Sequence, residues 1–190
     1  YSGKSVSFSN SGNILAIGAP GNDDNGISSG HVRIYDYNGS FWNQLGQDID
    51  GEAADDEFGF RISLSADGNI VAIGAKRNDG TTGNLNDNRG HVRVYSYNGS
   101  SWFQLGQDID GASSHDQSGS AVSLSSDGSI LAIGAQNGAN GYGHVRVYSW
   151  DGSIWEQLGQ DIYGEGENVI SLPLALADLL ERHATGDTLL

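Results

Sequence analysis

A long unit recurs three times along the chain, and this repeat constrains the fold more than any other feature of the sequence. Each copy contains four matched segments in a fixed order. In the three copies these segments lie at 2–9, 58–65 and 118–125, at 15–19, 71–75 and 131–135, at 30–35, 90–95 and 143–148, and at 44–49, 104–109 and 157–162. Self-similarity of this kind is the signature of a repeat architecture, in which neighbouring units bury each other's apolar faces.

Each unit predicts four short strands joined by tight turns. In the first unit, residues 6–8 alternate apolar and polar side chains with the period of a half-buried strand. Residues 14–17 are continuously apolar, as in a strand that is covered on both faces. Residues 31–35 alternate again and lead to Asn38-Gly39, a strong hairpin signal. The fourth predicted strand starts near Trp42 and runs through the Leu-Gly-Gln-Asp-Ile segment.

The predicted fold class is all-β, with tandem four-stranded antiparallel blades that stack as in a β-propeller. The blades cover approximately residues 2–57, 58–117 and 118–163. Propellers typically need four to eight blades to close, so three blades predict an incomplete, three-bladed arc. The first and last blades of an arc would expose apolar faces. We therefore expect further blades or self-association as partners.

Residues 164–190 leave the repeat and form a separate tail. Pro173 near the beginning, basic residues near the end and Gly186 beyond them predict a short C-terminal helix. One face of that helix would carry Leu172, Leu176, Leu179 and Leu180. We expect the tail to cap the last blade.

The repeat resembles the FG-GAP family of β-propellers, the type found in integrin α-chain heads. The resemblance covers residues 2–163. It rests on Phe58-Gly59, with Ser2-Gly3 and Ser118-Gly119 in its place elsewhere, and on Gly18-Ala19-Pro20, which becomes Gly74-Ala75-Lys76 and Gly134-Ala135-Gln136. The resemblance implies an extracellular, non-enzymatic binding or adhesion module that is often stabilised by calcium.

The calcium loop of that family does not carry over to this sequence. Its counterparts here are short turns with at most one carboxylate each, Asp67 in the second unit and Asp127 in the third. The loops between the second and third strands are richer in oxygen ligands, which Ca²⁺ prefers. They supply the calcium candidates of the sequence: Asn22, Asp23, Asp24, Asp79, Asn84, Asn86 and Asn88. These residue types also form ordinary solvated turns, so we expect no required cofactor.

Repeated aromatic and basic side chains are assigned to structure. His31, His91 and His144 occupy one position in the three blades, and an arginine follows each of them two residues later. Equivalent placement indicates a contact that every blade needs. Trp42, Trp102 and Trp155 are expected in the cores between blades. Trp150 and Tyr142 remain as candidates for an exposed ligand surface.

Composition excludes several classes of function. The formal charge of −15 opposes binding to nucleic acid or to anionic membranes, and no apolar run is long enough to span a bilayer. The absence of Cys excludes disulfides and thiol chemistry, and the absence of Met predicts a processed chain or a fragment. Glu52, Asp55, Asp56 and Glu57 form an acidic cluster, which we interpret as a solvated loop rather than a catalytic pair.

The sequence thus favours an extracellular, non-enzymatic binding or adhesion scaffold whose ligand is a protein or a glycan. Two alternatives stay open. The repeated aromatic residues and the acidic loops also suit a carbohydrate-binding or carbohydrate-active propeller module. A chain with no ligand at all would be a purely structural spacer.

Overall fold

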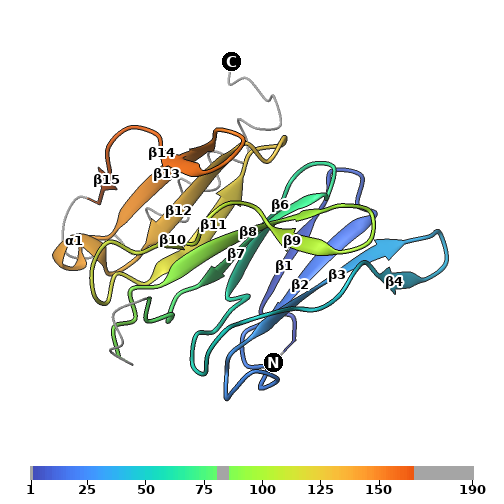
Figure 1. Ribbon diagram of the computed structural model, residues 1–190, viewed down its shortest axis with the longest axis horizontal. Coiled ribbons are helices and arrows are strands. Elements are labelled where there is room, and N and C mark those ends of the chain that lie inside the picture. The colour runs from blue at the N-terminus through green and yellow to red at the C-terminus, as the bar shows by residue number, and fades with distance from the viewer. Residues whose placement is uncertain (1, 81–85, 165–190) are drawn as a thin grey trace.

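The computed structural model describes residues 2–80 and 86–164, in which three antiparallel sheets follow one another along the chain (Figure 1). The predicted C-terminal helix and Asn84 lie outside the described residues. The first sheet contains β1 (Ser5–Phe8), β2 (Ile14–Ala19), β3 (His31–Tyr37), β4 (Trp42–Gln44) and β5 (Ile49–Asp50). The second contains β6 (Arg61–Leu64), β7 (Ile70–Ala75), β8 (His91–Tyr97), β9 (Trp102–Gln104) and β10 (Ile109–Asp110). The third contains β11 (Ser118–Leu124), β12 (Ile130–Ala135), β13 (His144–Trp150), β14 (Trp155–Gln157) and β15 (Ile162–Tyr163).

The predicted all-β class and the tandem arrangement are confirmed, and the row of sheets is open rather than closed into a ring (Figure 1). Within the first sheet the strands lie in the order β1-β2-β3-β4, so each strand pairs with its neighbour in sequence. The third sheet repeats this order with β11-β12-β13-β14. Hairpin connections of this kind give the up-and-down pattern of a propeller blade.

The fourth predicted strand of each unit is wrong in one respect, because it is two short strands instead of one. In the first sheet β4 and β5 both pair with β3, at its two ends. The interruption contains Gly46, which has a φ of 76°. A side chain at Gly46 would lie against the indole of Trp102, with a Cβ only 2.8 Å from that ring. The close approach of the next blade therefore explains both the glycine and the break in the strand.

Two hydrophobic cores lie between the sheets. The first core takes Val32, Ile34 and Ile49 from the first blade and Ile73 and Trp102 from the second. The second core is built in the same way between the second and third blades and ends on Trp155. The second blade thus buries one face against the first blade and the other against the third, as stacked repeats require.

A glutamine side chain joins each pair of neighbouring blades through the backbone of the buried tryptophan. Gln47 Nε2 donates to the Trp102 carbonyl at 2.7 Å, and the Trp102 amide donates back to Gln47 Oε1 at 3.1 Å. Gln107 makes the same two bonds to Trp155, at 2.8 and 3.1 Å. The indole N–H of each tryptophan also donates to a leucine carbonyl of the preceding blade. These bonds satisfy backbone groups on the free edges of β9 and β14.

Serine hydroxyls make a second set of bonds between blades. Ser7 Oγ accepts from the Leu64 amide and Ser63 Oγ accepts from the Leu124 amide, both at 3.0 Å. Ser123 occupies the same position in the third blade, but its buried Oγ has no hydrogen-bond partner among the described residues. Among the described residues no further blade follows the third one, so no backbone amide there corresponds to the donors at Leu64 and Leu124.

Within residues 2–80 and 86–164, no further sheet covers the outer faces of the first and last blades. Trp42 was expected in a core but is 42% exposed, whereas Trp102 and Trp155 are 4% and 3% exposed. The expectation fails at Trp42 because none of the three described sheets packs over it as the first blade packs over Trp102. Leu158 and Tyr163 are exposed on the third blade in the same manner.

Helical structure is confined to one short turn among the described residues. This is α1 (Gly138–Gly141), which lies between β12 and β13 in the third blade. No helix in residues 2–80 and 86–164 is long and apolar enough to cross a membrane.

Candidate functional site

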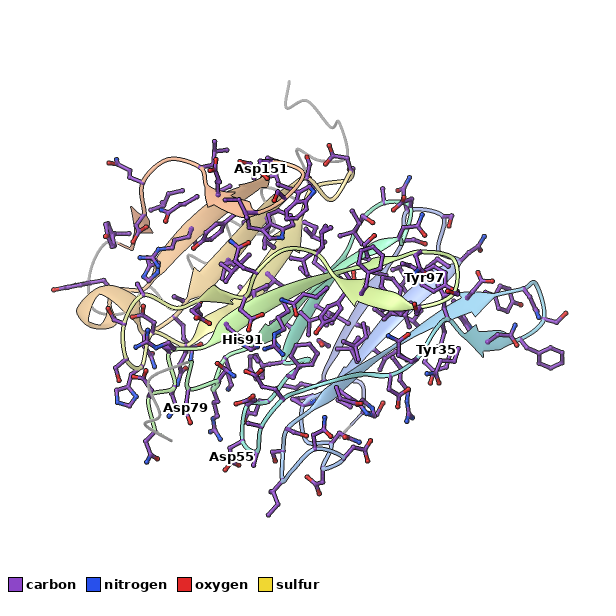
Figure 2. The ribbon with its side chains drawn as sticks, in the orientation of Figure 1. Tyr35, Asp55, Asp79, His91, Tyr97 and Asp151 are labelled. Carbon is purple, nitrogen blue, oxygen red and sulfur yellow. The ribbon has the colours of Figure 1, made fainter. Side chains whose placement is uncertain are left out.

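One end of every blade gathers the most variable loops of the chain. In the first sheet Ser5 lies opposite Gly18, Ala19 opposite His31, and His31 opposite Asp50. This register places the β2–β3 loop and the connection to the next blade at the same end. Asp55 and Asp79 lie there, far from Asp151 at the opposite end (Figure 2). We refer to this end as the loop end.

A basic pocket lies at the loop end between the first two blades. Its volume is about 650 Å³, and its lining consists of Ser2, Gly3, Lys4, Pro20, Gly21, Ser28, Glu57, Phe60 and Lys76. Three cationic groups lie over the Phe60 ring: Lys76 Nζ at 3.8 Å, Arg61 Cζ at 4.6 Å and Lys4 Nζ at 5.3 Å from its centroid. The whole chain has only 9 Lys and Arg, so this grouping concentrates positive charge in an acidic protein.

A polar pocket lies at the loop end between the second and third blades. Its volume is about 560 Å³, and its lining consists of Asp55, Arg77, Asp79, Asn86, Asn88, His115, Gln117 and Asn137. The structure thus brings together Asp79, Asn86 and Asn88, three of the calcium candidates. The Asn88 amide donates to Asp79 Oδ1 at 2.8 Å, so one oxygen of that carboxylate already stabilises the loop through a backbone hydrogen bond.

Both pockets are built on strained backbone. Every non-glycine residue with positive φ in residues 2–80 and 86–164 lines one of them. The basic pocket has Ser28 at 54° and Glu57 at 56°, while the polar pocket has Asp55 at 67°, Asn88 at 45°, His115 at 64° and Gln117 at 55°. Such conformations cost of the order of 1–3 kcal/mol each and persist only where the surrounding structure fixes them.

The strained positions correspond between the two blade junctions. Asn88 takes the place of Ser28 in the repeat, and His115 and Gln117 take the places of Asp55 and Glu57. The backbone bonds correspond as well, because the residue 57 amide donates to the Ser28 carbonyl and the Gln117 amide donates to the Asn88 carbonyl. The backbone is therefore repeated while the side chains that it presents are changed. A constant backbone that presents different side chains is typical of a binding scaffold.

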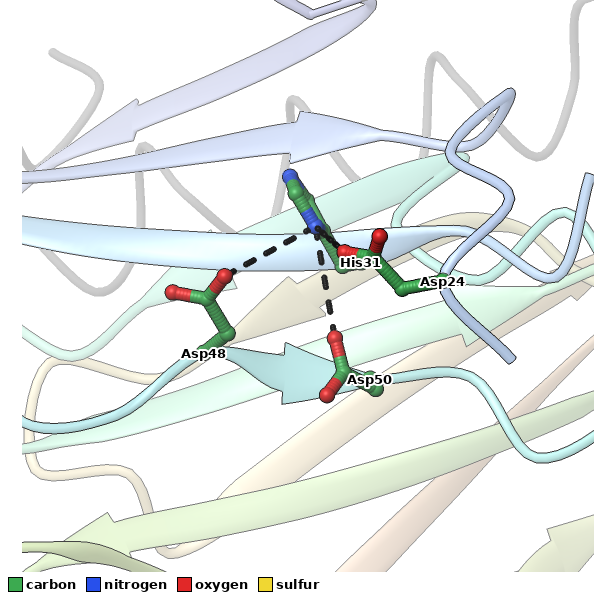
Figure 3. A group of neighbouring side chains, drawn as sticks. All are labelled: Asp24, His31, Asp48 and Asp50. Atoms are coloured by element: carbon green, nitrogen blue, oxygen red, sulfur yellow. Dashed lines mark ion pairs between the residues drawn. The ribbon is translucent and has the colours of Figure 1, made fainter.

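The calcium candidates in the first β2–β3 loop divide into two groups. Asn22 Oδ1 accepts from the Asp24 amide at 3.0 Å, and Asp23 Oδ1 accepts from the Ser28 amide at 2.8 Å. These two side chains stabilise the turns of the loop. Asp24 instead approaches His31 and two further carboxylates, Asp48 and Asp50 (Figure 3). Sequence reasoning missed the two carboxylates, although Asp48 belongs to the Gln-Asp-Ile segment of all three units and Asp50 recurs as Asp110 in the second.

The arginine of each blade has a partner within the same blade. Arg33, Arg93 and Arg146 each place Nη2 at 2.7 Å from the carboxylate fifteen residues later, Asp48, Asp108 and Asp161 respectively. The hydrogen bond from Arg146 holds the pKa of Asp161 well below its usual range. The constant spacing in the repeat was a signal for these pairs.

The acidic cluster of the sequence is separated by the fold. Glu52 pairs with Arg93, and Glu57 pairs with Lys76 at 3.3 Å and with Arg77 at 3.1 Å. Asp56 is only 3% exposed, and burial raises its pKa to about 6. Asp56 Oδ2 accepts from Asn78 Nδ2 at 3.0 Å and from the Ala53 amide at 3.2 Å.

The two candidate surface aromatics lie at opposite ends of β13. Tyr142 precedes that strand at the loop end and is 39% exposed. Trp150 ends the strand and packs against Trp155, with ring centroids 5.4 Å apart. A side chain at Gly106 of the second blade would meet the Trp150 ring, so Trp150 belongs to a blade interface. The two residues therefore do not form one ligand surface.

Comparison with known proteins identifies the fold alone. No family model and no curated protein matches the sequence. Among solved structures the chain is similar to a proposed 6-phosphogluconolactonase from Bacteroides uniformis, with a TM-score of 0.57 at 14% identity over 86% of this chain and 42% of that one. It is also similar to the hydrazine synthase of Kuenenia stuttgartiensis, with a TM-score of 0.52 at 12% identity over 84% of this chain and 36% of that one.

These likenesses agree with the architecture of the blades. The fold is β-propeller-like, as the three stacked antiparallel sheets already indicated. The chain spans less than half the length of the structures that it matches. At such low identity the comparisons assign no activity and no ligand to this chain.

Proposed function

We propose that this chain is a non-enzymatic binding scaffold that holds its ligand at the loop end of the blades. The observation that carries the proposal is the concentration of all left-handed, non-glycine residues of the described chain in two pockets. The scaffold uses the same backbone at both junctions and varies the side chains, which is how loops on a rigid framework acquire different ligands.

The basic pocket defines the class of ligand. Lys4 and Lys76 flank the Phe60 ring within a chain of net charge −15. Lys76 pairs with Glu57 of the same pocket, so the exposed ammonium group of Lys4 and the aromatic face are the groups that favour a ligand with a carboxylate beside an apolar surface. An acidic side chain of a protein partner has this chemistry, and we propose such a partner as the ligand.

We also propose an extracellular location and membership of an FG-GAP-like group of propellers. Both follow from the resemblance of the repeat, namely Phe58-Gly59, Gly18-Ala19-Pro20 and the spacing of the four segments. The polar pocket keeps carbohydrate binding as the second candidate, because its carboxylate, amide and imidazole groups suit sugar hydroxyls.

The partner for the open third blade is proposed to be a second copy of this chain, joined head to tail. The third blade offers Gln160, Leu158 and the unpaired Oγ of Ser123, the positions that hold the next blade at both internal junctions. The first blade of a second copy offers the exposed Trp42 to the glutamine. Light scattering of the 190-residue chain should then give concentration-dependent oligomers, which Leu158→Glu dissociates.

The binding proposal is tested with immobilised chain, an array of acidic peptides and an array of neutral and uronic-acid glycans. We expect acidic peptides to bind and Lys4→Gln to weaken that binding several-fold, because Lys4 is exposed and its replacement leaves the core intact. Glu156→Gln, an exposed residue of β14, serves as the control and should bind as the unchanged protein does. Binding to neutral glycans alone would support the second candidate. Hydrolysis of any bound glycan would contradict a non-enzymatic role.

A further inference from the structure

The imidazole of His31 is buried without a hydrogen bond to its Nδ1 atom. Its side chain is 8% exposed, and Nδ1 has no partner among the described residues. Three carboxylate oxygens surround this nitrogen: Asp24 Oδ2 at 3.7 Å, Asp48 Oδ2 at 4.0 Å and Asp50 Oδ1 at 4.0 Å (Figure 3). These separations are too long for hydrogen bonds. A buried polar atom left in this way needs a partner of another kind.

The negative charge of the carboxylates around His31 favours binding of a cation. Arg33 pairs with Asp48 and is 41% exposed, and no other Lys or Arg in the described residues forms an ion pair with Asp24 or Asp50. The cluster therefore has negative charge beyond what Arg33 balances.

We propose that Asp24, His31, Asp48 and Asp50 form a site for one divalent transition-metal ion, with Zn²⁺ as the best-matched species. The four ligand atoms lie within 4.8 Å of one another. Tetrahedral coordination with bonds of about 2.0–2.1 Å places ligand atoms about 3.4 Å apart. The three nitrogen-to-oxygen separations of 3.7–4.0 Å therefore have to shorten by roughly half an ångström, and a pair of ligand atoms at the 4.8 Å limit by about 1.4 Å. Asp24 is on an exposed loop and is free to make that movement, since its side chain is 61% exposed.

The imidazole nitrogen decides the type of metal. Ca²⁺ and Mg²⁺ take oxygen ligands, whereas imidazole together with carboxylate suits Zn²⁺ and its neighbours in the first transition row. Arg33 donates to Asp48 from Nε and Nη2 and fixes its orientation, as the outer hydrogen-bond partners of metal ligands do. Bound metal would attach the β2–β3 loop to β3 and β5.

The other blades show why the site belongs to the first one. In the second blade His91 lies near Glu52 and Asp108, but the guanidinium of Arg93 pairs with both carboxylates. A cation of the protein therefore already balances the two carboxylates of that cluster. In the third blade Tyr163 replaces Asp50 and packs against His144, with ring centroids 6.2 Å apart. The second blade provides a matched control for the first.

The test uses the untagged 190-residue chain after treatment with a chelator. Thermal unfolding is followed with Zn²⁺, Mn²⁺ and Ca²⁺, and Co²⁺ absorption reports coordination directly. We expect Zn²⁺ to raise the melting temperature by several degrees at micromolar concentration, and Co²⁺ to develop visible bands. Asp24→Asn, a change on the exposed loop that leaves the core intact, should weaken Zn²⁺ binding about 10–100-fold. His31→Gln should remove the Co²⁺ bands.

Glu52→Gln, in the connection that contributes to the His91 cluster, is the control and should bind Zn²⁺ as the unchanged chain does. No response to Zn²⁺ would overturn the proposal. A response that Asp24→Asn leaves unchanged, or that Glu52→Gln abolishes, would also overturn it because the metal would then bind elsewhere. Stabilisation by Ca²⁺ and not by Zn²⁺ would refute the role of the imidazole. All of these outcomes are independent of the ligand proposed for the basic pocket.

Discussion

Replacement of Gln107 by alanine tests the polar junction between the second and third blades. The Gln107 side chain donates to the Trp155 carbonyl at 2.8 Å and accepts from the Trp155 amide at 3.1 Å. Trp155 is only 3% exposed, so loss of the glutamine leaves two backbone groups of β14 without protein partners. Gln160 occupies the same place in the third blade, but it is exposed and has no hydrogen bond to a described residue.

The expected loss of stability in Gln107→Ala follows from these two hydrogen bonds. A neutral hydrogen bond contributes a net stability of about 0.5–1.5 kcal/mol, and the partly exposed position lets water replace some of that contribution. We expect Gln107→Ala to lower the free energy of unfolding by about 1–2 kcal/mol, which corresponds to roughly 3–6 °C in melting temperature for a chain of this size. Gln160→Ala should change the free energy of unfolding by less than about 0.5 kcal/mol.

Urea denaturation followed by tryptophan fluorescence measures both variants against the unchanged chain. All samples are compared at one low protein concentration, since association through the open face would involve Gln160. Equal losses of unfolding free energy in Gln107→Ala and Gln160→Ala would refute the reasoning. The contribution of the glutamine would then not depend on a neighbouring blade. An unchanged midpoint for Gln107→Ala would refute it as well.

Three further predictions concern the interior of the blade row. The raised pKa of Asp56, about 6 against about 3.9 for an unfolded chain, means that its buried charge lowers stability as pH rises from 4 to 7. Asp56→Asn should therefore be more stable than the unchanged chain by about 1–2 kcal/mol at pH 7.5, with no difference near pH 4 in urea titrations. Phe58→Ala removes a fully buried ring and should cost about 3–5 kcal/mol, whereas Phe103→Ala, 44% exposed, should cost less than about 1 kcal/mol by the same method. Gly74→Ala would press a Cβ against the Gly119 carbonyl of the next blade, and calorimetry should show a loss of about 1–3 kcal/mol; an unaltered melting temperature would contradict so close an approach.

Much of the fold follows from local pattern. Alternation at residues 6–8, the apolar run at 14–17 and the Asn38-Gly39 turn gave strands and a hairpin that the structure contains. The break after Gln44 did not follow, because strand propensity carries on through Leu45. It depends on Trp102 lying against Gly46, a contact between two blades.

The candidate sites were predictable only in part. The sequence predicted Asp24 as a possible metal ligand in a polar loop. It assigned His31 to a structural role, because all three blades carry a histidine at this position. Its difference from His91 depends on Glu52, which comes from the preceding connection and brings Arg93 into the second cluster. A repeated residue can thus have different surroundings in each copy.

The sequence by itself determined the repeat, the strands and their stacking into blades, because side-chain periodicity and turn residues act over a few neighbouring positions. Only the tertiary structure decided which carboxylates surround His31, where the backbone is strained and which pockets open at the loop end. Those features join residues from β3, β5 and the β2–β3 loop, or from two successive blades. Their positions depend on how the sheets pack, and no local pattern in the chain contains that information.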